Sequence, residues 1–333
     1  MSRAGAPPGD ELRILADWLS LFPTAGPRVV IGPGDDAAAL RCAPGKVLVT
    51  TTDAMVEGVH FLREAFPARA VGRKALAVNL SDLAAMGASS RWLLCSLVIP
   101  PGLGRRWLRE AGEGMAGLCR AEGVTLVGGN ISAGPKLELH LTLLGEADPA
   151  RLLRRSGARE GDGIWVSGTL GDAALGLSRL QGLSRPPARP GKLQLRQLEP
   201  TARTVLGRAL AGRQLASACL DVSDGLALDL RRLCEASGVG ARIALEHLPL
   251  SAPARRALSR MEDPWAPPVS GGEDYELLFT VPPGKTRALE RFLARSGHAA
   301  TRIGEITQER RVKLVLPGGK VYRPASLGYR HQA

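Results

Sequence analysis

Residues 219–226 read CLDVSDGL, an apolar run that changes into an acidic turn within three residues. The apolar and β-branched residues up to Val222 predict a buried strand. Leucines recur on one side of the following segment, 225–237, which predicts a helix. The stretch therefore predicts a strand, a turn that carries two aspartates and a helix, which is a building unit of proteins that mix the two kinds of element.

Helices and strands alternate along the rest of the chain in two comparable halves. Predicted helices cover 11–21, 67–86, 107–122 and a segment from 171, and predicted strands cover 47–52, 92–99, 125–127, 137–143, 164–168 and 275–281. The polar residues 79–82 leave a break in the second helix open, 184–192 is predicted to be a loop, and disorder is expected before Glu11. A second domain is predicted to begin near residue 148. We expect an α/β (α+β) chain with mixed sheets and two domains, 1–148 and 149–333.

The composition is that of a globular protein and excludes several classes. Of 333 residues, 44% are apolar and 23% charged, and the net charge is +12. The basic residues are mostly scattered arginines, and aromatic residues make up only 4%, which argues against a stacking platform for nucleic acid. Five cysteines without a CxxC pair do not predict a disulfide framework. No secretory or membrane-spanning apolar segment is evident, so we expect a cytoplasmic protein without a membrane partner.

Carboxylates gather in one kind of sequence context, at strand ends or in turns rich in glycine and serine. These residues are Asp36, Asp53, Asp82, Asp221, Asp224, Glu273 and Asp274. Oxygen ligands on loops are what Mg²⁺ prefers, especially where phosphates complete its coordination shell, and nearby hydroxyls such as Thr51 and Thr52 could contribute. Any one of these acids could equally cap a helix or form a turn. Their clustering in an arginine-rich chain favours the metal-site interpretation.

Motifs of other enzyme classes are missing from the sequence. It contains no GxxxxGK[ST] phosphate loop, no protein-kinase catalytic loop, no GxSxG and no HExxH. The two glycines 128–129 would let a backbone approach a phosphate closely, but two glycines are a weak signal.

Six motifs follow one another along the chain. They are GDDAA at 34–38, TTD at 51–53, EGVHF at 57–61, KALAVNLSDLAAMGA at 74–88, DVSDGL at 221–226 and SGGEDYEL at 270–277. In order and spacing, over nearly the whole chain, these motifs resemble the thiamine-monophosphate kinase family. The resemblance implies a two-domain fold like that of aminoimidazole ribonucleotide synthetase, with an N-terminal mixed sheet that pairs across a homodimer and a C-terminal α/β domain. It also implies transfer of the γ-phosphoryl group of ATP to thiamine monophosphate, assisted by several Mg²⁺ ions.

The resemblance assigns roles residue by residue, with no general base. Metal ligands would be Asp36, Thr51, Thr52, Asp53, Asp82, Asn130, Asp221 and Asp224. Nucleotide contacts would be Gly129, Asn130, Arg155 and Ser223, with Gly129 and Asn130 on a turn. Substrate contacts would be His60, Glu273 and the position of Ser326.

Two positions depart from the family pattern. Asn130 stands where the family usually has an aspartate, which removes one negative charge from a metal site. Ser326 stands where an aromatic substrate contact is usual, so that Tyr329 or another residue would have to stack on the substrate.

Two alternatives stay open on the sequence. One is another enzyme of the same superfold, such as an aminoimidazole ribonucleotide synthetase, a selenophosphate synthetase or a hydrogenase-maturation dehydratase. The other is a basic nucleic-acid-binding or regulatory protein that has lost its activity, supported only by the net charge of +12 and by Asn130.

Overall fold

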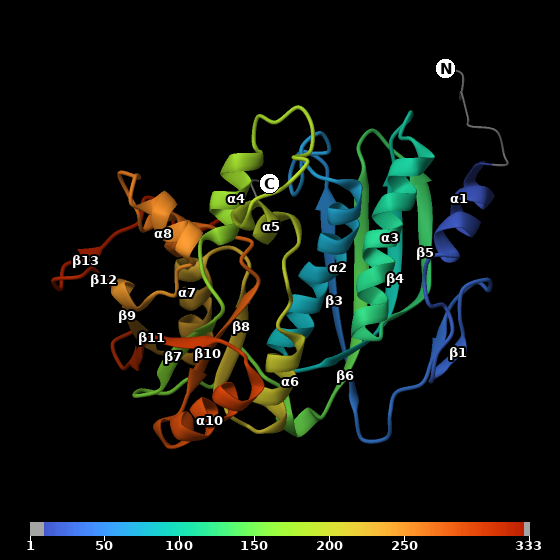
Figure 1. Cartoon of the computed structure of the whole chain (residues 1–333). Coiled ribbons are helices and arrows are strands. Elements are labelled where there is room, and N and C mark those ends of the chain that lie inside the picture. The colour runs from blue at the N-terminus through green and yellow to red at the C-terminus, as the bar shows by residue number, and fades with distance from the viewer. Residues whose placement is uncertain (1–9, 330–333) are drawn as a thin grey trace. The chain divides into compact units, whose positions relative to one another are not determined.

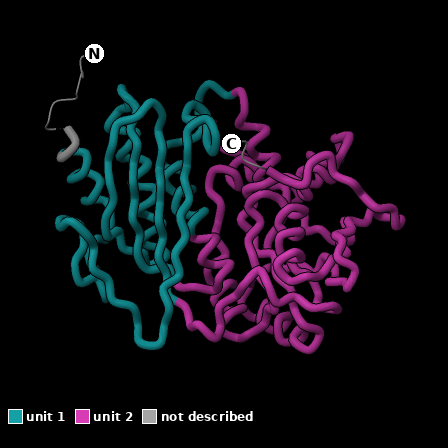
Figure 2. Tube along the Cα trace, turned by 180° about the vertical axis from the view of Figure 1, so that it is seen from behind, with its two compact units in different colours: residues 1–79, 90–146, 183–186 teal, residues 80–89, 147–182, 187–333 magenta. Residues whose placement is uncertain are grey.

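The computed structural model describes residues 10–329 (Figure 1). The expectation of disorder before Glu11 concerns residues outside this range, except Asp10, which begins helix α1. The described chain forms two compact units (Figure 2). Unit 1 comprises the residues up to 79, 90–146 and 183–186, and unit 2 comprises 80–89, 147–182 and the residues from 187 onward.

Unit 1 is built on a four-stranded sheet with the order β3-β6-β4-β5. The strands are β3 (Val47–Val56), β4 (Ser89–Ile99), β5 (Thr125–Ala133) and β6 (Glu138–Ala147), beside a small pair of β1 (Val29–Ile31) and β2 (Ala39–Leu40). The helices are α1 (Asp10–Leu19), α3 (Arg105–Glu122) and α2 (Ala68–Ala85), whose residues from 80 onward belong to unit 2. Helices α2 and α3 lie together on the sheet (Figure 1) and touch through glycines. A Cβ on Gly72 would lie 1.9 Å from the Ala111 carbonyl oxygen, so the two backbones meet only because this side chain is missing.

Unit 2 is built on a seven-stranded sheet with the order β13-β12-β9-β11-β7-β10-β8. Its strands are β7 (Gly163–Ser167), β8 (Ala218–Val222), β9 (Gly240–Ala244), β10 (Glu276–Val281), β11 (Ala300–Thr307), β12 (Val312–Val315) and β13 (Val321–Tyr322). Its α-helices are α4 (Asp172–Leu180), α5 (Lys192–Leu198), α6 (Thr204–Gly212), α7 (Leu226–Ser237), α8 (Ala252–Leu258), α9 (Ala266–Ser270) and α10 (Thr286–Ser296). Short 3₁₀ turns cover Pro149–Arg151, Leu245–His247 and Pro283–Lys285. The pairing is antiparallel except between β9 and β12.

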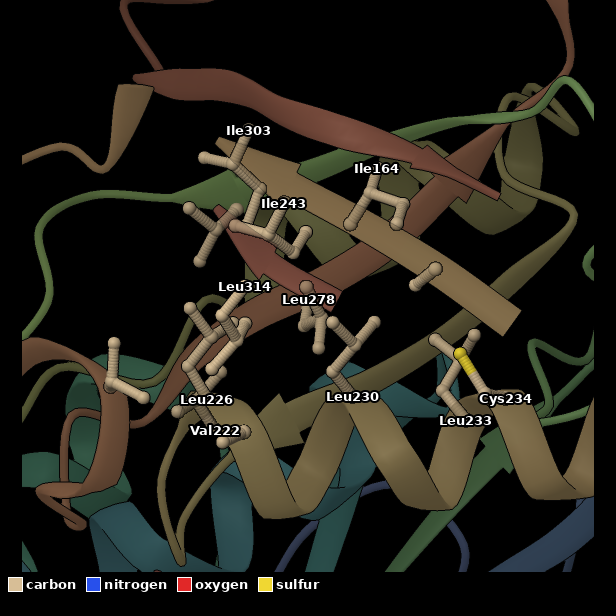
Figure 3. Packing of buried hydrophobic residues seen from close by; sticks show 14 of the residues in the cluster. Ile164, Val222, Leu226, Leu230, Leu233, Cys234, Ile243, Leu278, Ile303 and Leu314 are labelled. Atoms are coloured by element: carbon tan, nitrogen blue, oxygen red, sulfur yellow. The ribbon is translucent and has the colours of Figure 1, made fainter. Parts of the chain in front are cut away.

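The sheet of unit 2 is buried on both faces. Successive residues of a strand point to opposite faces, and in β10 Leu278 packs with helix α7 whereas Phe279 packs with α6 and α10. Leucines of α7, among them Leu226 and Leu230, meet the isoleucines of neighbouring strands (Figure 3). The predicted strand, turn and helix around residue 221 are therefore confirmed, with the strand inside a layered core.

Three sequence expectations differ from the structure. Helix α2 runs unbroken through 79–82, because the Asn79 side chain donates to the Ala75 carbonyl oxygen of the preceding turn (3.0 Å) and leaves the helix bonds intact. Strand β3 continues three residues past Asp53. Residues Gly129 and Asn130 lie within strand β5, not on a turn, because β5 pairs in parallel with β4 up to Ala133. In the described residues, no helix has both the length and the apolar character needed to span a membrane.

Candidate functional site

The acidic turn after strand β8 meets the end of helix α2 inside unit 2. The Ser81 hydroxyl donates to Asp221 Oδ2 (2.7 Å), and Asp221 is buried. Burial, followed by the charge of Asp82, raises the pKa of Asp221 to about 7. A second negative charge beside a buried carboxylate is unfavourable unless a cation compensates it. Asp82 and Asp221 are therefore candidates for binding a cation together.

Asp229 holds the acidic turn in place from the first turn of helix α7. Its Oδ2 accepts the backbone N–H groups of Ser223 (3.1 Å), Asp224 (3.0 Å) and Gly225 (3.1 Å). Burial foremost raises the pKa of Asp229, against the lowering effect of these hydrogen bonds. Sequence reasoning missed Asp229, although an acid in the first helical turn, four residues after a glycine, is a usable signal for such an anchor.

Arg232 pairs with the same turn from the next turn of α7. One of its nitrogens, Nη1, lies 2.6 Å from Asp224 Oδ2 and 2.7 Å from Asp229 Oδ1. The guanidinium therefore partly neutralises Asp224, whose side chain is 25% exposed and open to a further ligand. This arginine was also missed, because nothing in the local sequence distinguishes it from Arg231.

Three separate segments of unit 2 are joined at this turn by backbone hydrogen bonds. The N–H of Glu273 donates to the Ser223 carbonyl (2.7 Å), and the N–H of Tyr329 donates to the Asp224 carbonyl (2.9 Å). Glycines permit these close approaches, since a Cβ on Gly328 would lie 2.4 Å from the Asp224 oxygen. The structure thus brings together the predicted residues Asp221, Ser223, Asp224, Glu273 and Ser326, which are up to 105 residues apart.

The side chain of Ser326 is engaged within its own segment. Its hydroxyl donates to the Gly328 carbonyl (2.9 Å), and its carbonyl accepts from the Ser270 hydroxyl. Ser326 therefore shapes the C-terminal tail, and Tyr329, 49% exposed, is the aromatic residue of this tail.

Arg155 is not brought to this turn within unit 2. Its carbonyl accepts from Ser237 at the C-terminal end of helix α7 (3.2 Å), whereas Ser223 precedes the N-terminal end. A helix of 12 residues spans about 18 Å. The backbone of Arg155 therefore lies away from Ser223. The nucleotide contact of Arg155 stays a prediction.

In unit 1, a hollow of about 570 Å³ gathers another group of the predicted residues. It is lined by the loop that carries Asp36, by Gly129 and Asn130 of β5 and by Thr142 of β6. The backbone at Gly129 passes so close to β4 that a Cβ there would lie 1.9 Å from the Cys95 carbonyl oxygen. The close packing of β5 against β4 thus requires glycine at position 129, independently of any ligand in the hollow.

The threonines of strand β3 divide between the two faces of the sheet. Thr52 Oγ1 donates to the Leu141 carbonyl (3.0 Å) and accepts from Thr142 Oγ1 (3.2 Å), so this hydroxyl is bound within the sheet. Thr51 and Asp53 point to the other face. None of the three lines the hollow beside Asp36.

His60 closes a turn after strand β3. Its ring Nδ1 accepts a hydrogen bond from the backbone N–H of Val56 (3.1 Å). The backbone N–H of His60 donates to the Val56 carbonyl oxygen (2.9 Å). In a neutral imidazole whose Nδ1 accepts, the proton is on Nε2, which is then a donor. The ring is therefore oriented with a donor nitrogen on the side away from the turn.

The predicted metal ligands are distributed over both units. Asp82, Asp221 and Asp224 belong to unit 2, Asp36 and Asn130 line the hollow of unit 1, and the β3 residues Thr51, Thr52 and Asp53 lie outside that hollow. Among residues 10–329, no three histidine, cysteine, aspartate or glutamate side chains are arranged as a ready-made metal site. The donors present nevertheless fit magnesium, because they are carboxylate, hydroxyl and amide oxygens, and because Asp82 and Asp221 repel each other without a cation.

Comparisons with known proteins agree with this arrangement. Residues 34–147 match the family described as AIR synthase related protein, N-terminal domain, and residues 159–317 match its C-terminal domain. The thiamine-monophosphate kinase of Escherichia coli (strain K12) is 40% identical over 306 residues, which is 90% of this chain and 91% of that protein. This chain belongs to the thiamine-monophosphate kinase family. The family member of Aquifex aeolicus is also 40% identical, over 75% of this chain and 80% of its own length.

Solved structures of thiamine-monophosphate kinases share the fold. The crystal structure of the Stenotrophomonas maltophilia K279a enzyme is 38% identical, covers 91% of this chain and 94% of its own, and has a TM-score of 0.80. AaThiL complexed with AMPPCP and TMP is 32% identical, with coverage of 99% and 100% and a TM-score of 0.75. The hydrogenase maturation protein HypE, at 23% identity and a TM-score of 0.77, shares the fold alone. The predicted family and the two-domain α/β fold class are confirmed.

Proposed function

We propose that this chain transfers the γ-phosphoryl group of ATP to thiamine monophosphate and produces thiamine diphosphate. The family match over nine-tenths of the chain carries this conclusion. A family member solved with the ATP analogue AMPPCP and with TMP supports both substrates.

The site suits this chemistry because the acceptor is a phosphate oxygen that is already anionic near neutral pH. The reaction needs two polyanions to be held in line and their charge to be neutralised, and no strong general base. When bound, Mg²⁺ supplies that neutralisation and polarises the transferred group. Asp82, Asp221 and Asp224 would hold the ion in unit 2, and Asp229 fixes the turn that follows Asp221.

The remaining ligands and contacts follow the family resemblance. Asp36, Asn130, Thr51, Thr52 and Asp53 would hold further magnesium ions in unit 1. Ser223, Gly129, Asn130 and Arg155 would contact the nucleotide.

The thiamine moiety carries a cationic ring, which a carboxylate can bind. Glu273 lies beside the acidic turn through its bond to Ser223 and is suited to this contact. His60 would donate from Nε2. Ser326 would contribute through the shape of the tail, with Tyr329 as the aromatic contact.

We further propose a homodimer formed through the sheet of unit 1. Strand β3 is an edge strand of 10 residues, and its apolar side chains Val47 and Leu48 are exposed. A long exposed edge strand with apolar side chains is normally covered. The family profile matches, which end at 147 and resume at 159, support the proposed domain boundary near 148.

A cytoplasmic location is also proposed. All five cysteines are free, and four of them are buried. Free thiols are typical of a reducing compartment, where a disulfide would not form.

The deciding experiment is an ADP-release assay with ATP and Mg²⁺, with and without thiamine monophosphate, followed by chromatography of the product. We expect thiamine diphosphate to form only with both substrates. The Asp221→Asn variant should lose about 100-fold or more in kcat, because the charge that holds the metal is removed. The matched control is Asp263→Asn, since Asp263 is a half-buried aspartate of the same unit that accepts from Tyr322.

Each outcome has a clear meaning. Nucleotide binding without thiamine diphosphate formation would indicate a different acceptor phosphate within the same superfold. Absence of nucleotide binding would overturn the kinase assignment.

A further inference from the structure

The segment that carries Glu273 has an unusual backbone. Glu273 has φ = 67° and Tyr275 has φ = 50°, both in the left-handed region that residues with a Cβ rarely adopt. Each such residue costs about 1–2 kcal/mol. Two of them within three residues persist only where the surroundings hold the chain firmly, and such strain gathers at functional sites.

Hydrogen bonds from other elements hold the backbone of this segment. Tyr275 N–H donates to the Val222 carbonyl (2.9 Å), next to the bond from Glu273 to Ser223. Between them, the buried Asp274 carboxylate accepts from Gly171 N–H (2.8 Å) at the start of helix α4. These bonds fix the backbone position of Glu273, but they do not fix the direction in which its carboxylate points.

Helix α5 reaches the side chain of Glu273. Gln197 Nε2 donates to Glu273 Oε2, and Gln197 is only 1% exposed. The neighbouring Arg196 Nη2 donates to the Asp274 carbonyl (3.3 Å) and to Glu276 Oε1 (2.7 Å). Two adjacent residues of one short helix therefore bind three residues of the strained segment and of the strand that follows, namely Glu273, Asp274 and Glu276.

A glutamine at position 197 destabilises the folded state. Its Oε1 is buried without a hydrogen-bond partner in the described part of the chain, which costs about 1–3 kcal/mol. An apolar residue would avoid that cost, and the position of α5 is already secured by the buried Leu193 and Leu198. The polar group is explained if its task is to orient the Glu273 carboxylate.

We propose that Gln197 is a positioning residue for Glu273. By binding Oε2, it holds the carboxylate in one orientation and presents Oε1 to the cationic ring of thiamine monophosphate. This inference rests on the proposed function, in which Glu273 contacts that substrate. It adds helix α5, which the sequence motifs did not include, to the substrate-binding apparatus.

The test replaces Gln197 by Leu, and by Met as a second variant that keeps the side-chain length in case the Leu variant does not fold. We expect KM for thiamine monophosphate to rise about 10-fold, which corresponds to the loss of one hydrogen bond to a charged group. KM for ATP should change less than about twofold, and kcat should be retained, because the contact serves binding of one substrate. Gln194→Leu is the matched control, since Gln194 lies on the same helix, is half-buried, and bonds to Gly191 N–H and the Arg179 carbonyl instead of to Glu273.

A double-mutant cycle separates positioning from a merely structural role. In the Glu273→Ala background, Gln197→Leu (or →Met) should cause no further rise in KM for thiamine monophosphate. Additive effects, or an unchanged KM in the Gln197 variants, would overturn the inference and leave the function standing. If Glu273→Ala itself leaves this KM unchanged, the proposed substrate contact fails instead.

Discussion

At the scale of single residues, Asn130 stands at a position where the family resemblance leads us to expect an aspartate. Asn130 lines the hollow that also contains Asp36. In the proposed metal site, its amide would offer magnesium an oxygen without a charge. Since affinity for hard cations rises with the number of charged ligands, this position should tune the affinity of the unit 1 site for magnesium.

The Asn130→Asp variant should therefore bind magnesium more tightly. We expect the Mg²⁺ concentration for half-maximal activity to fall about 3- to 10-fold, and direct calorimetric titration with Mg²⁺ to show the same shift. Ser132→Asp, on the same face of β5, adds the same charge two residues away and is the control. Equal effects of both variants would mean that long-range electrostatic attraction of Mg²⁺, and not direct coordination by residue 130, is responsible.

Gly129 should be required for stability regardless of any ligand. In Gly129→Ala, the new Cβ would meet the Cys95 carbonyl oxygen, and we expect a loss of about 2–3 kcal/mol in the free energy of unfolding, measured by urea denaturation. In Gly128→Ala, the Cβ would lie 3.0 Å from a terminal carbon of the flexible Leu94 side chain, so the loss should be smaller. The prediction is wrong if the two alanine variants are equally stable.

At the scale of elements, the start of helix α7 depends on one buried carboxylate. Asp229→Ala would leave three backbone N–H groups of the acidic turn without their acceptor. We expect a loss of about 2–4 kcal/mol in stability, together with weaker magnesium binding, by denaturation and calorimetry. Glu235→Ala should leave both quantities nearly unchanged, because Glu235 lies on the same helix and its exposed carboxylate pairs with the exposed Arg231. Retention of stability by the Asp229 variant would show that the turn holds its shape without this anchor.

The cap of helix α4 should make stability depend on pH. Burial foremost raises the pKa of Asp274 to about 7, despite the hydrogen bond from Gly171. An unfolded aspartate titrates near about 3.9, so between pH ~4 and 7 the folded state binds the additional proton. The contribution of Asp274 to stability is then largest below pH ~4, falls as pH rises through this range, and is constant above it.

Asp274→Asn removes this titration and keeps an oxygen acceptor. Measured by denaturation at constant ionic strength, the free energy of unfolding of the variant relative to the natural protein should improve from pH 5 to about pH 7 and then level off. A difference that does not vary with pH would mean that Asp274 does not titrate in this range.

At the scale of the whole molecule, exposed apolar residues of unit 1 provide the test of the proposed dimer. Leu48 on edge strand β3 is 48% exposed, and Met261 in unit 2 is 42% exposed. Light scattering should give the mass of a dimer for the natural protein and for Met261→Glu, and that of a monomer for Leu48→Glu. A dimeric Leu48→Glu variant, or a monomeric natural protein, would contradict assembly through this strand.

The sequence by itself determined the family, the two-part α/β organisation and the residues of the acidic turn. These are local properties. A few neighbouring residues are enough to recognise the periodicity of a strand or helix, or the motif from Asp221 to Leu226. Only the tertiary structure decided that Asp53 and Asn130 lie within strands, since strand length is set by pairing with neighbours. It also revealed Asp229 and Gln197 as supports, because their roles depend on which N–H groups and carboxylates the fold brings to them. A hydrogen bond between residues 76 apart, as between Gln197 and Glu273, leaves no mark in the local pattern of either segment.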